Sequence, residues 1–336
     1  MSEFSLADLA GVPTSFETDL RAILGRSSNL LPELLHTTER RLSREVVFER
    51  GEVDELFVKA LQRAFVYLSY PTSMSGSALV DGDAGPGTNR ALAFFLMEEG
   101  LPHENDPGAL ASSTIADVKR KMASERLTRE GLASLLRAVF YRATGAPTGG
   151  SMIASIDHLN ATESGIQLSC RKMFDLYGGD AARAARELKA GAAAVADPAF
   201  LLAVAKQETH GIIRSRFEQH YYAARRPMVE EGKGRLARLQ ASSHGLGQIM
   251  GSNAKALGLG DVYQLWSAAP QEQLEYIGRF ILTTPAAVVL SGKSPIDLKG
   301  CRLVARYYNG PAFAANRYDQ RLLGWYTEFR ALFAGG

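Results

Sequence analysis

The sequence predicts an all-α protein folded in two domains, and three observations lead to this prediction. Apolar residues recur at intervals of three and four positions through most of the chain, which is the spacing of amphipathic helices. Alternating apolar and polar residues, the pattern of strands, are scarce. The length of 336 residues is enough for two domains with buried cores. The clearest helical spacing is found in residues 53–67, 128–141, 181–190, 271–282 and 302–308.

A segment rich in helix-breaking residues predicts the boundary between the domains. Residues 144–151 read TGAPTGGS and have no periodic apolar positions. We therefore expect a helical N-terminal domain over 1–145, a linker over 146–151 and a second helical domain over 152–336.

Composition and the N-terminal residues indicate a protein made in the cytoplasm without a signal peptide. Apolar residues make up 46% and charged residues 22%, as in soluble globular proteins. No apolar run approaches the roughly 20 residues of a membrane-spanning helix, so we expect no membrane anchor. The N-terminus, MSEFSLADLAGV, carries acidic residues where a signal peptide carries positive charge. Cys170 and Cys301 form neither a disulfide framework nor a metal site, so we expect two buried thiols, no metal and no cofactor.

The two halves of the chain differ in charge. Residues 1–150 contain 16 Lys and Arg against 20 Asp and Glu, and residues 151–336 contain 22 against 16. A basic C-terminal half suits an anionic polymer, such as the bacterial wall or a nucleic acid, although a net charge of this size is also ordinary for a domain. A nucleic-acid binder would place stacking aromatic rings among basic residues. Only residues 302–308 offer a faint version of that pattern, so we expect no nucleic-acid partner.

A turn-rich loop precedes one helix of the N-terminal half. The dipeptide Asp81-Gly82 and the tripeptide Gly85-Pro86-Gly87 favour turns, and Thr88 is expected to be the N-cap of the helix that follows. The simplest interpretation is a tight loop at the start of a core helix.

The same segment resembles the peptidoglycan-binding module that is often attached to wall hydrolases. That family has an Asp-Gly-x-x-Gly-x-x-Thr loop followed by a helix that ends in Phe-Gln. The resemblance covers about residues 80–115 and implies a wall-binding loop, although Leu96 stands where the family has Gln. Residues 1–70 resemble no family. The matching residues are Asp81, Gly82, Gly85, Thr88 and Phe95.

A helix in the second half carries the candidate acid. Asp197 followed by Pro198 is a strong helix start, because Asp caps the first turn and Pro fits it. Glu208 falls on the same stripe as Leu201, Val204 and Ala205, so it is expected to face the core, and Gly211 ends the helix. Loss of hydration raises the pKa of a carboxyl group, and a proton donor at neutral pH needs this property. The alternative is a buried glutamate that an arginine or backbone donors satisfy.

Two further segments contain groups that suit a sugar ligand. Residues 243–251 read SHGLGQIMG, in which small residues allow close backbone approach and Gln248 offers a donor and an acceptor. Residues 307–311 read YYNGP, with aromatic and amide groups at the end of an apolar helix. Each segment alone is a weak signal.

Together these segments resemble the N-acetylmuramidase family of phage endolysins and bacterial wall hydrolases, over about residues 195–330. Goose-type lysozymes and soluble lytic transglycosylases share the layout of a helix ending in Glu-Ser/Thr, a Gly-Leu-x-Gln segment and Tyr-Asn-Gly. The departures are Thr209 in place of Ser, an inserted His210, and a longer stretch over 223–240. The matching segments are KQETHG at 206–211, FEQH at 217–220, SHGLGQIMG at 243–251, YNGP at 308–311 and YD at 318–319.

The resemblance implies a lysozyme-like helical domain that cuts the bond between N-acetylmuramic acid and N-acetylglucosamine in bacterial peptidoglycan. Glu208 is then the general acid, and Glu218 is the candidate for the second carboxylate. The positions implied for substrate binding are Thr209, His220, Ser243, Gln248, Tyr308 and Asn309.

The sequence leaves several alternatives open. Glu218 could instead pair with Arg214, Arg216 or Arg225. Without a second carboxylate, the hydroxyl of the muramic acid attacks, and the enzyme is a lytic transglycosylase that releases an anhydro sugar. A lysozyme fold without activity could also serve as a wall anchor, although the presence of Glu208 argues against it. A metallopeptidase is disfavoured because the HExxH pattern is absent.

The expected cellular role follows from the resemblance. We expect a bacteriolytic, antimicrobial monomer that acts on peptidoglycan in the periplasm. It would arrive there either as a phage endolysin, after release through a holin, or as a secreted antibacterial effector. An effector would have an immunity protein or a component of the secretion apparatus as a partner.

Overall fold

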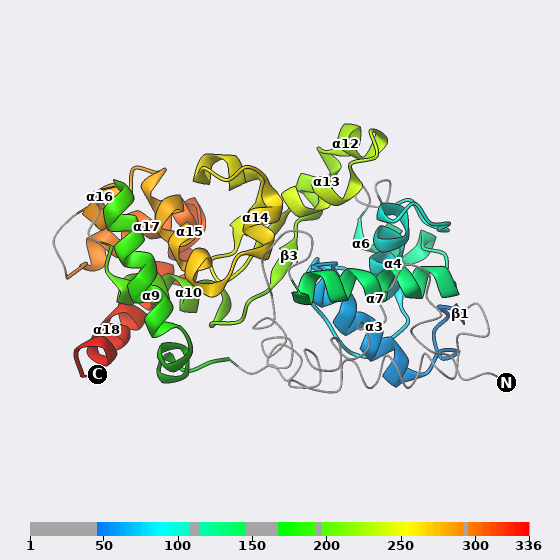
Figure 1. The fold of residues 1–336 in the computed structure, drawn as a ribbon, viewed down its shortest axis with the longest axis horizontal. Coiled ribbons are helices and arrows are strands. Elements are labelled where there is room, and N and C mark those ends of the chain that lie inside the picture. The colour runs from blue at the N-terminus through cyan, green and yellow to red at the C-terminus, as the bar shows by residue number, and fades with distance from the viewer. Residues whose placement is uncertain (1–45, 108–113, 145–166, 193–195, 292–294, 336) are drawn as a thin grey trace. The chain divides into compact units, whose positions relative to one another are not determined.

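The computed structural model describes residues 46–107, 114–144, 167–192, 196–291 and 295–335, and helices dominate these residues (Figure 1). The strands among them contain only two or three residues each. The prediction of an all-α protein is therefore confirmed. Each of the five segments with helical spacing overlaps a helix of the structure.

The chain divides into two compact units. The N-terminal unit combines residues up to 165 with residues 214–243, and the C-terminal unit combines 166–213 with 244–336. This differs from the division expected from the sequence, which assigned 214–243 to the second domain. The expected linker, 146–151, lies outside the described residues.

In the N-terminal unit, helix α3 (Glu55–Tyr67) packs against α4 (Pro86–Glu98) and α7 (Arg129–Thr144) (Figure 1). Residues 91–96 of α4 are at most 1% exposed, so this helix is buried on all sides. The unit begins with β1 (Val46–Val47), which pairs antiparallel with β2 (Arg126–Leu127), Val46 lying opposite Leu127. The helices are α3 (Glu55–Tyr67), α4 (Pro86–Glu98), α6 (Ile115–Lys121) and α7 (Arg129–Thr144).

Residues 214–243 belong to the N-terminal unit because their large side chains pack against α4. The ring of Phe94 meets those of Phe217 and Tyr222, with centroids 5.3 and 5.2 Å apart. Arg238 and Glu98 form a buried ion pair at 2.7 Å. The elements of this segment are β3 (Ser215–Phe217), α11 (Gln219–Ala223), α12 (Arg226–Glu230), α13 (Gly234–Gln240) and β4 (Ser242–His244), the last being the neighbour of β3.

In the C-terminal unit, α10 (Pro198–Thr209) lies at the centre and packs against α9 (Cys170–Ala192), α15 (Pro270–Leu282) and α18 (Tyr318–Gly335). All residues from 199 to 206 are buried, so α10 has no solvent-facing side along this stretch. The remaining elements are β5 (Ile249–Met250), η2 (Gly251–Leu257), α14 (Val262–Ser267), α16 (Ala287–Ser291), α17 (Leu298–Tyr308) and η3 (Pro311–Asn316).

Two expectations about the core can be compared with the structure. Cys170 and Cys301 are free thiols and both are buried, as expected. The burial raises the pKa of each thiol to about 12, which keeps both in the unreactive thiol form. Among the described residues, no helix has the length and apolar content needed to cross a bilayer.

Candidate functional site

Glu208 lies in the last turn of the buried helix α10, where its side chain is half-buried. The start of this helix is as predicted, because the Asp197 carboxylate accepts a hydrogen bond from the backbone N of Ala199 at 3.0 Å. At the other end, His210 adopts a left-handed conformation as the C-cap. The buried helix thus holds the carboxyl group of Glu208 at a fixed point at the edge of the core.

Two tyrosines from other helices lie beside this carboxyl group. The hydroxyl of Tyr318, the first residue of α18, donates a hydrogen bond to Oε1 of Glu208. Burial, together with the negative charge of Glu208, raises the pKa of Tyr318 and of Tyr308 well above the ordinary value. Both hydroxyls therefore remain protonated and able to donate near neutral pH.

The start of α18 is anchored next to this contact. Asp319 is buried and forms an ion pair with Nε of Arg302 on α17 at 3.0 Å. Since Tyr318 directly precedes Asp319, this pair fixes the backbone that carries the tyrosine. The two residues of the Tyr-Asp dipeptide thus have different contacts. Tyr318 binds the carboxyl group of Glu208, and Asp319 anchors the start of α18.

The backbone turn of residues 245–248 packs against the end of α10. The Thr209 hydroxyl lies 3.0 Å from the carbonyl oxygen of Ala205 and 3.1 Å from that of Leu246. The Tyr308 hydroxyl donates to the carbonyl oxygen of Gly247 at 2.7 Å. The turn is therefore joined both to the residue after Glu208 and to a tyrosine beside it.

Gln273 on α15 holds the same turn from its other side. Its Oε1 accepts a hydrogen bond from the backbone N of Leu246 at 2.8 Å, and its Nε2 donates to the carbonyl oxygen of Ala268 at 2.7 Å. Gly245 has φ +71°, and a Cβ there would lie 2.6 Å from Gln273 Oε1. The sequence predicts that the small residues of this segment allow close approach to its backbone. In the structure the groups that come close are protein side chains, namely Gln273 and Tyr308.

The structure brings some of the predicted residues together in the C-terminal unit. Glu208, Thr209 and Tyr308 meet around the turn, to which Gln248 also belongs. Nε2 of Gln248 donates to the carbonyl oxygen of Gly245 at 3.0 Å. Asn309 is the exposed C-cap of α17.

The remaining predicted site residues belong to the N-terminal unit. Glu218 precedes α11 and forms an ion pair with Nε of Arg216 at 3.3 Å, which is one of the pairings left open by the sequence. His220 is exposed, with its ring 4.2 Å from that of Tyr221. Ser243 is buried, and its hydroxyl donates to the carbonyl oxygen of Arg216 at 3.4 Å.

Two residues, one beside Glu208 and one that holds the turn of residues 245–248, have no role predicted from the sequence. In the sequence Tyr318 belongs only to a matching dipeptide, and nothing indicates that it reaches a residue 110 positions away. Gln273 lies in a helix whose pattern predicts only its apolar face. Its burial, to 4% exposure, is a feature that the sequence alone does not signal.

The loop of residues 81–88 is organised by Gln62, a buried residue of α3. Gln62 Nε2 donates to Asp81 Oδ1 at 2.8 Å and to Thr88 Oγ1 at 2.9 Å. Gln62 Oε1 accepts from the backbone N of both Asp81 and Gly82 at 2.9 Å. Gly82 has φ +80°, a conformation that favours glycine.

The prediction that Thr88 caps helix α4 is wrong. The helix begins one turn earlier, with Gly85 as N-cap and Pro86 in the first position. Thr88 is buried inside the first turn, and its hydroxyl donates to the carbonyl oxygen of Asp83 at 2.7 Å. Pro fits the first helical position because it lacks an N–H, and this shifts the start of the helix toward the loop.

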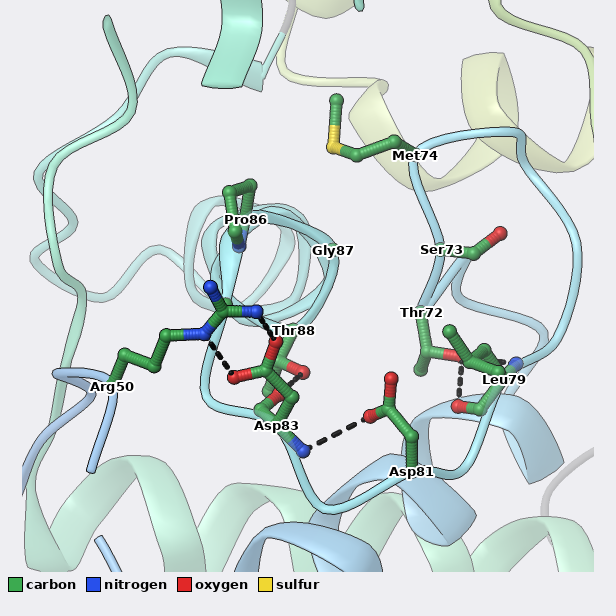
Figure 2. Close-up of a pocket in the computed structure, with 11 residues that line it drawn as sticks. Arg50, Thr72, Ser73, Met74, Leu79, Asp81, Asp83, Pro86, Gly87 and Thr88 are labelled. Atoms are coloured by element: carbon green, nitrogen blue, oxygen red, sulfur yellow. Dashed lines mark hydrogen bonds and ion pairs between the residues drawn. The ribbon is translucent and has the colours of Figure 1, made fainter. Parts of the chain in front are cut away.

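A surface pocket of about 220 Å³ lies between this loop and residues 72–79 (Figure 2). Asp81, Gly85 and Thr88 of the predicted wall-binding loop line it, together with Arg50. Arg50 forms a two-point ion pair with Asp83, at 2.9 Å from Nε and 2.5 Å from Nη2.

Comparisons with known proteins bear on the identity of the chain. The family model described as Muramidase: N-acetylmuramidase matches residues 231–330. Among solved structures, the crystal structure of Burkholderia AP3 phage endolysin is similar over 86% of this chain and 100% of that chain, with 20% identity and a TM-score of 0.35. No curated protein matches the chain.

The matched range begins after Glu208 and Glu218 and includes the turn of residues 245–248, Tyr308 and Tyr318. It thus covers most of the groups that surround the carboxyl group of Glu208. Residues 231–330 therefore match an N-acetylmuramidase domain, and this match supports a glycoside hydrolase that acts on peptidoglycan.

Proposed function

We propose that this chain hydrolyses the bond between N-acetylmuramic acid and N-acetylglucosamine, with Glu208 as the general acid. The observation that carries the proposal is the hydrogen bond from Tyr318 to Glu208, at the end of a helix buried on all sides. A general acid must present its proton at a fixed position, and this contact restricts the orientation of the carboxyl group.

In the proposed reaction, Glu208 transfers its proton to the glycosidic oxygen as the bond to the muramic acid carbon breaks. The sugar acquires oxocarbenium character, and a water molecule completes the hydrolysis. Glu218 is our candidate for the carboxylate that removes a proton from this water. Its ion pair with Arg216 fits the structural alternative, so its role needs its own test.

We assign the neighbouring residues by what their polar atoms contact. Thr209 is 1% exposed and its hydroxyl faces two carbonyl oxygens, so we propose that it holds the turn against α10. Tyr308 is proposed to fix the same turn through Gly247. We propose Gln248, Asn309, Ser243 and His220 as substrate contacts, and the side chains of Asn309 and His220 are exposed.

We further propose that the loop of residues 81–88 retains the protein on the wall and takes no part in bond cleavage. The rigid hydrogen-bond network around Gln62 supports this role, because a preorganised loop binds without a large ordering cost. The cellular role would be wall lysis, either as a phage endolysin or as an antibacterial effector.

The products of a sacculus digest test the reaction type. Hydrolysis leaves a reducing N-acetylmuramic acid, whereas a lytic transglycosylase leaves an anhydro sugar that is lighter by one water. We expect mass spectrometry to find reducing ends. A digest containing only anhydro ends would replace hydrolysis by transglycosylation, and absence of any cleavage would favour a wall-binding protein without activity.

A further inference from the structure

Arg321 lies on α18 beside the contact between Tyr318 and Glu208. It follows Tyr318 by three positions, and residues three apart lie on the same face of a helix. Tyr318 is buried and its hydroxyl binds Glu208, whereas Arg321 is exposed. This face of α18 therefore leads from the proposed acid to the solvent, where a substrate would approach.

The positive charge of Arg321 acts on this contact. Burial and the negative charge of Glu208 raise the pKa of Tyr318, and the charge of Arg321 acts in the opposite direction. Such an effect requires the guanidinium group to be near the tyrosine hydroxyl. The charge of Arg321 is therefore also near the carboxyl group of Glu208 that this hydroxyl binds.

The guanidinium group of Arg321 is available to a ligand. Within the described part of the chain, it forms no hydrogen bond or ion pair. The neighbouring carboxylate, Asp319, is already paired with Arg302 at 3.0 Å. Farther along α18, Arg330 lies over the ring of Tyr326, with its guanidinium carbon 5.7 Å from the centroid. Arg321 thus adds a cation beside the proposed acid that no described carboxylate binds.

The substrate of the proposed reaction carries anionic groups near the bond that is cleaved. N-acetylmuramic acid differs from N-acetylglucosamine by a lactyl ether on C3, one ring carbon away from C1, where the bond breaks. The lactyl carboxyl group is free in a strand without peptide. Where a stem peptide is attached, this group is an amide and the first free carboxylate belongs to the peptide. A guanidinium group binds a carboxylate through two parallel hydrogen bonds.

We propose that Arg321 binds a carboxylate on the lactyl branch of the muramic acid whose bond Glu208 cleaves. Arg321 is then a specificity-determining residue that favours muramic acid over neutral N-acetylglucosamine at this position. The carboxylate is either that of the lactyl group itself or the first one of an attached stem peptide. The inference rests on the proposed function, because it requires the substrate to lie at Glu208.

Isothermal titration calorimetry on the full-length protein tests the proposal with two pairs of ligands. The first pair is the disaccharide N-acetylglucosaminyl-N-acetylmuramic acid and its lactyl methylamide. The second pair is the same disaccharide bearing L-alanyl-D-glutamate γ-methylamide, with the α-carboxyl group free or amidated. These disaccharides contain no bond from muramic acid to N-acetylglucosamine, so the proposed reaction does not consume them.

We expect the acid of one pair to bind at least about tenfold more tightly than its amide, because the amide loses a charge-assisted hydrogen bond. A difference in the first pair identifies the lactyl carboxylate, and a difference in the second pair identifies the peptide carboxylate. Equal binding of acid and amide in both pairs, or no binding of any of the four at millimolar concentration, would overturn the proposal.

Arg321→Gln locates the carboxylate. We expect this variant to bind acid and amide equally, at the affinity of the amide for the wild type, with an unchanged melting temperature because the side chain is exposed. Arg330→Gln is the matched control. It removes the same charge from an exposed position of α18 about two and a half turns farther on, on the opposite face, and should bind as the wild type does. An Arg321→Gln protein that still prefers the acid would contradict the proposal.

The outcome is separable from that of the proposed function. Binding of the disaccharides is measured whether or not sacculi are cleaved. Cleaved sacculi together with equal binding of acid and amide would remove the carboxylate assignment alone. Uncleaved sacculi together with a preference for the acid that depends on Arg321 would remove the catalytic proposal and leave the carboxylate contact in place.

Discussion

At the scale of single residues, Tyr318 is the side chain whose contact most directly concerns Glu208. Tyr318→Phe keeps the buried ring and removes the hydroxyl that donates to Oε1. Glu208 becomes charged as it gives up its proton, and a hydrogen bond to a charged group contributes about 1.5–3 kcal/mol, so we expect kcat to fall about tenfold to hundredfold with little change in KM. The measurement is steady-state cleavage of soluble glycan strands.

Tyr307→Phe is the matched control for this prediction. Tyr307 is the same residue type next to Tyr308, but 40% of it is exposed. We expect this variant to retain its activity. If Tyr318→Phe is also as active as the wild type, the contact with Glu208 has no part in catalysis.

The role of Glu218 is also decided at this scale. If Glu218 activates water, Glu218→Gln should lower kcat by about a hundredfold or more, while Arg216→Gln should leave most of the activity. If the pair is only an exposed ion pair, both changes should alter the free energy of unfolding alike, by about 1 kcal/mol or less, and leave turnover intact. We predict the first outcome, and equal turnover of the two variants would contradict it.

Sequence reasoning reached Glu208, Thr209 and Tyr308 because each stands in a short motif of recognisable chemistry. It gave no role to Tyr318, since its partner is 110 positions away along the chain. Nor could the sequence show that the buried Thr209 hydroxyl turns toward Leu246. Contacts between distant segments depend on the fold, and local patterns do not encode them individually.

At the scale of structural elements, the turn of residues 245–248 is held by Gln273. Gln273→Leu leaves the backbone N of Leu246 without its acceptor inside the protein, which costs about 1–3 kcal/mol. We expect a lower melting temperature and reduced activity, because the same turn contacts Thr209 and Tyr308. Thermal unfolding and the cleavage assay measure the two effects.

Gln271→Leu is the control within the same helix. Gln271 accepts a hydrogen bond from Arg183 at an exposed position, at 2.8 Å. Its replacement should change neither property much. Unchanged stability and activity in Gln273→Leu would show that the turn does not depend on α15.

The segment of residues 214–243 depends on the buried pair of Arg238 and Glu98. Arg238 also covers the ring of Tyr70, with its guanidinium carbon 3.8 Å from the ring centroid. Arg238→Met leaves Glu98 buried with fewer partners, so we expect the free energy of unfolding to fall by about 3 kcal/mol or more. Denaturant unfolding followed by circular dichroism gives this value.

Arg226→Met removes an exposed pair with Glu230 and should cost about 1 kcal/mol or less. If Arg238→Met is no more destabilising than this control, the buried pair does not hold the segment in place.

Most elements were predictable because helical spacing is a local property of the sequence. The apolar stripe that contains Leu201 and Val204 nevertheless predicts burial of only one face of α10. In the structure other helices cover α10 on every side. The start of α4 was misplaced because Thr88 is a good capping residue by type. Its hydroxyl instead accepts a hydrogen bond from Gln62 and donates one to the carbonyl oxygen of Asp83. Gln62 is distant in the sequence and Asp83 lies in the loop, so the sequence does not indicate these contacts.

At the scale of the whole molecule, the predicted helical class is confirmed, while the division into units differs from the expected one. The breaker-rich segment at 144–151 suggested a single boundary, but residues 214–243 pack against α4 of the N-terminal unit. A composition change marks where a chain is irregular. It does not show with which part of the chain a later segment will pack.

The central claim is that Glu208 supplies the proton for wall cleavage, and the loss of turbidity of purified sacculi tests it most directly. Glu208→Gln retains an oxygen that can accept from Tyr318 but has no acidic proton to give. We predict that this variant keeps its melting temperature and clears sacculi at least about a hundredfold more slowly than the wild type. Glu187→Gln, at an exposed position of α9, should clear them at the wild-type rate. A Glu208→Gln protein that clears sacculi as fast as the wild type would contradict the claim.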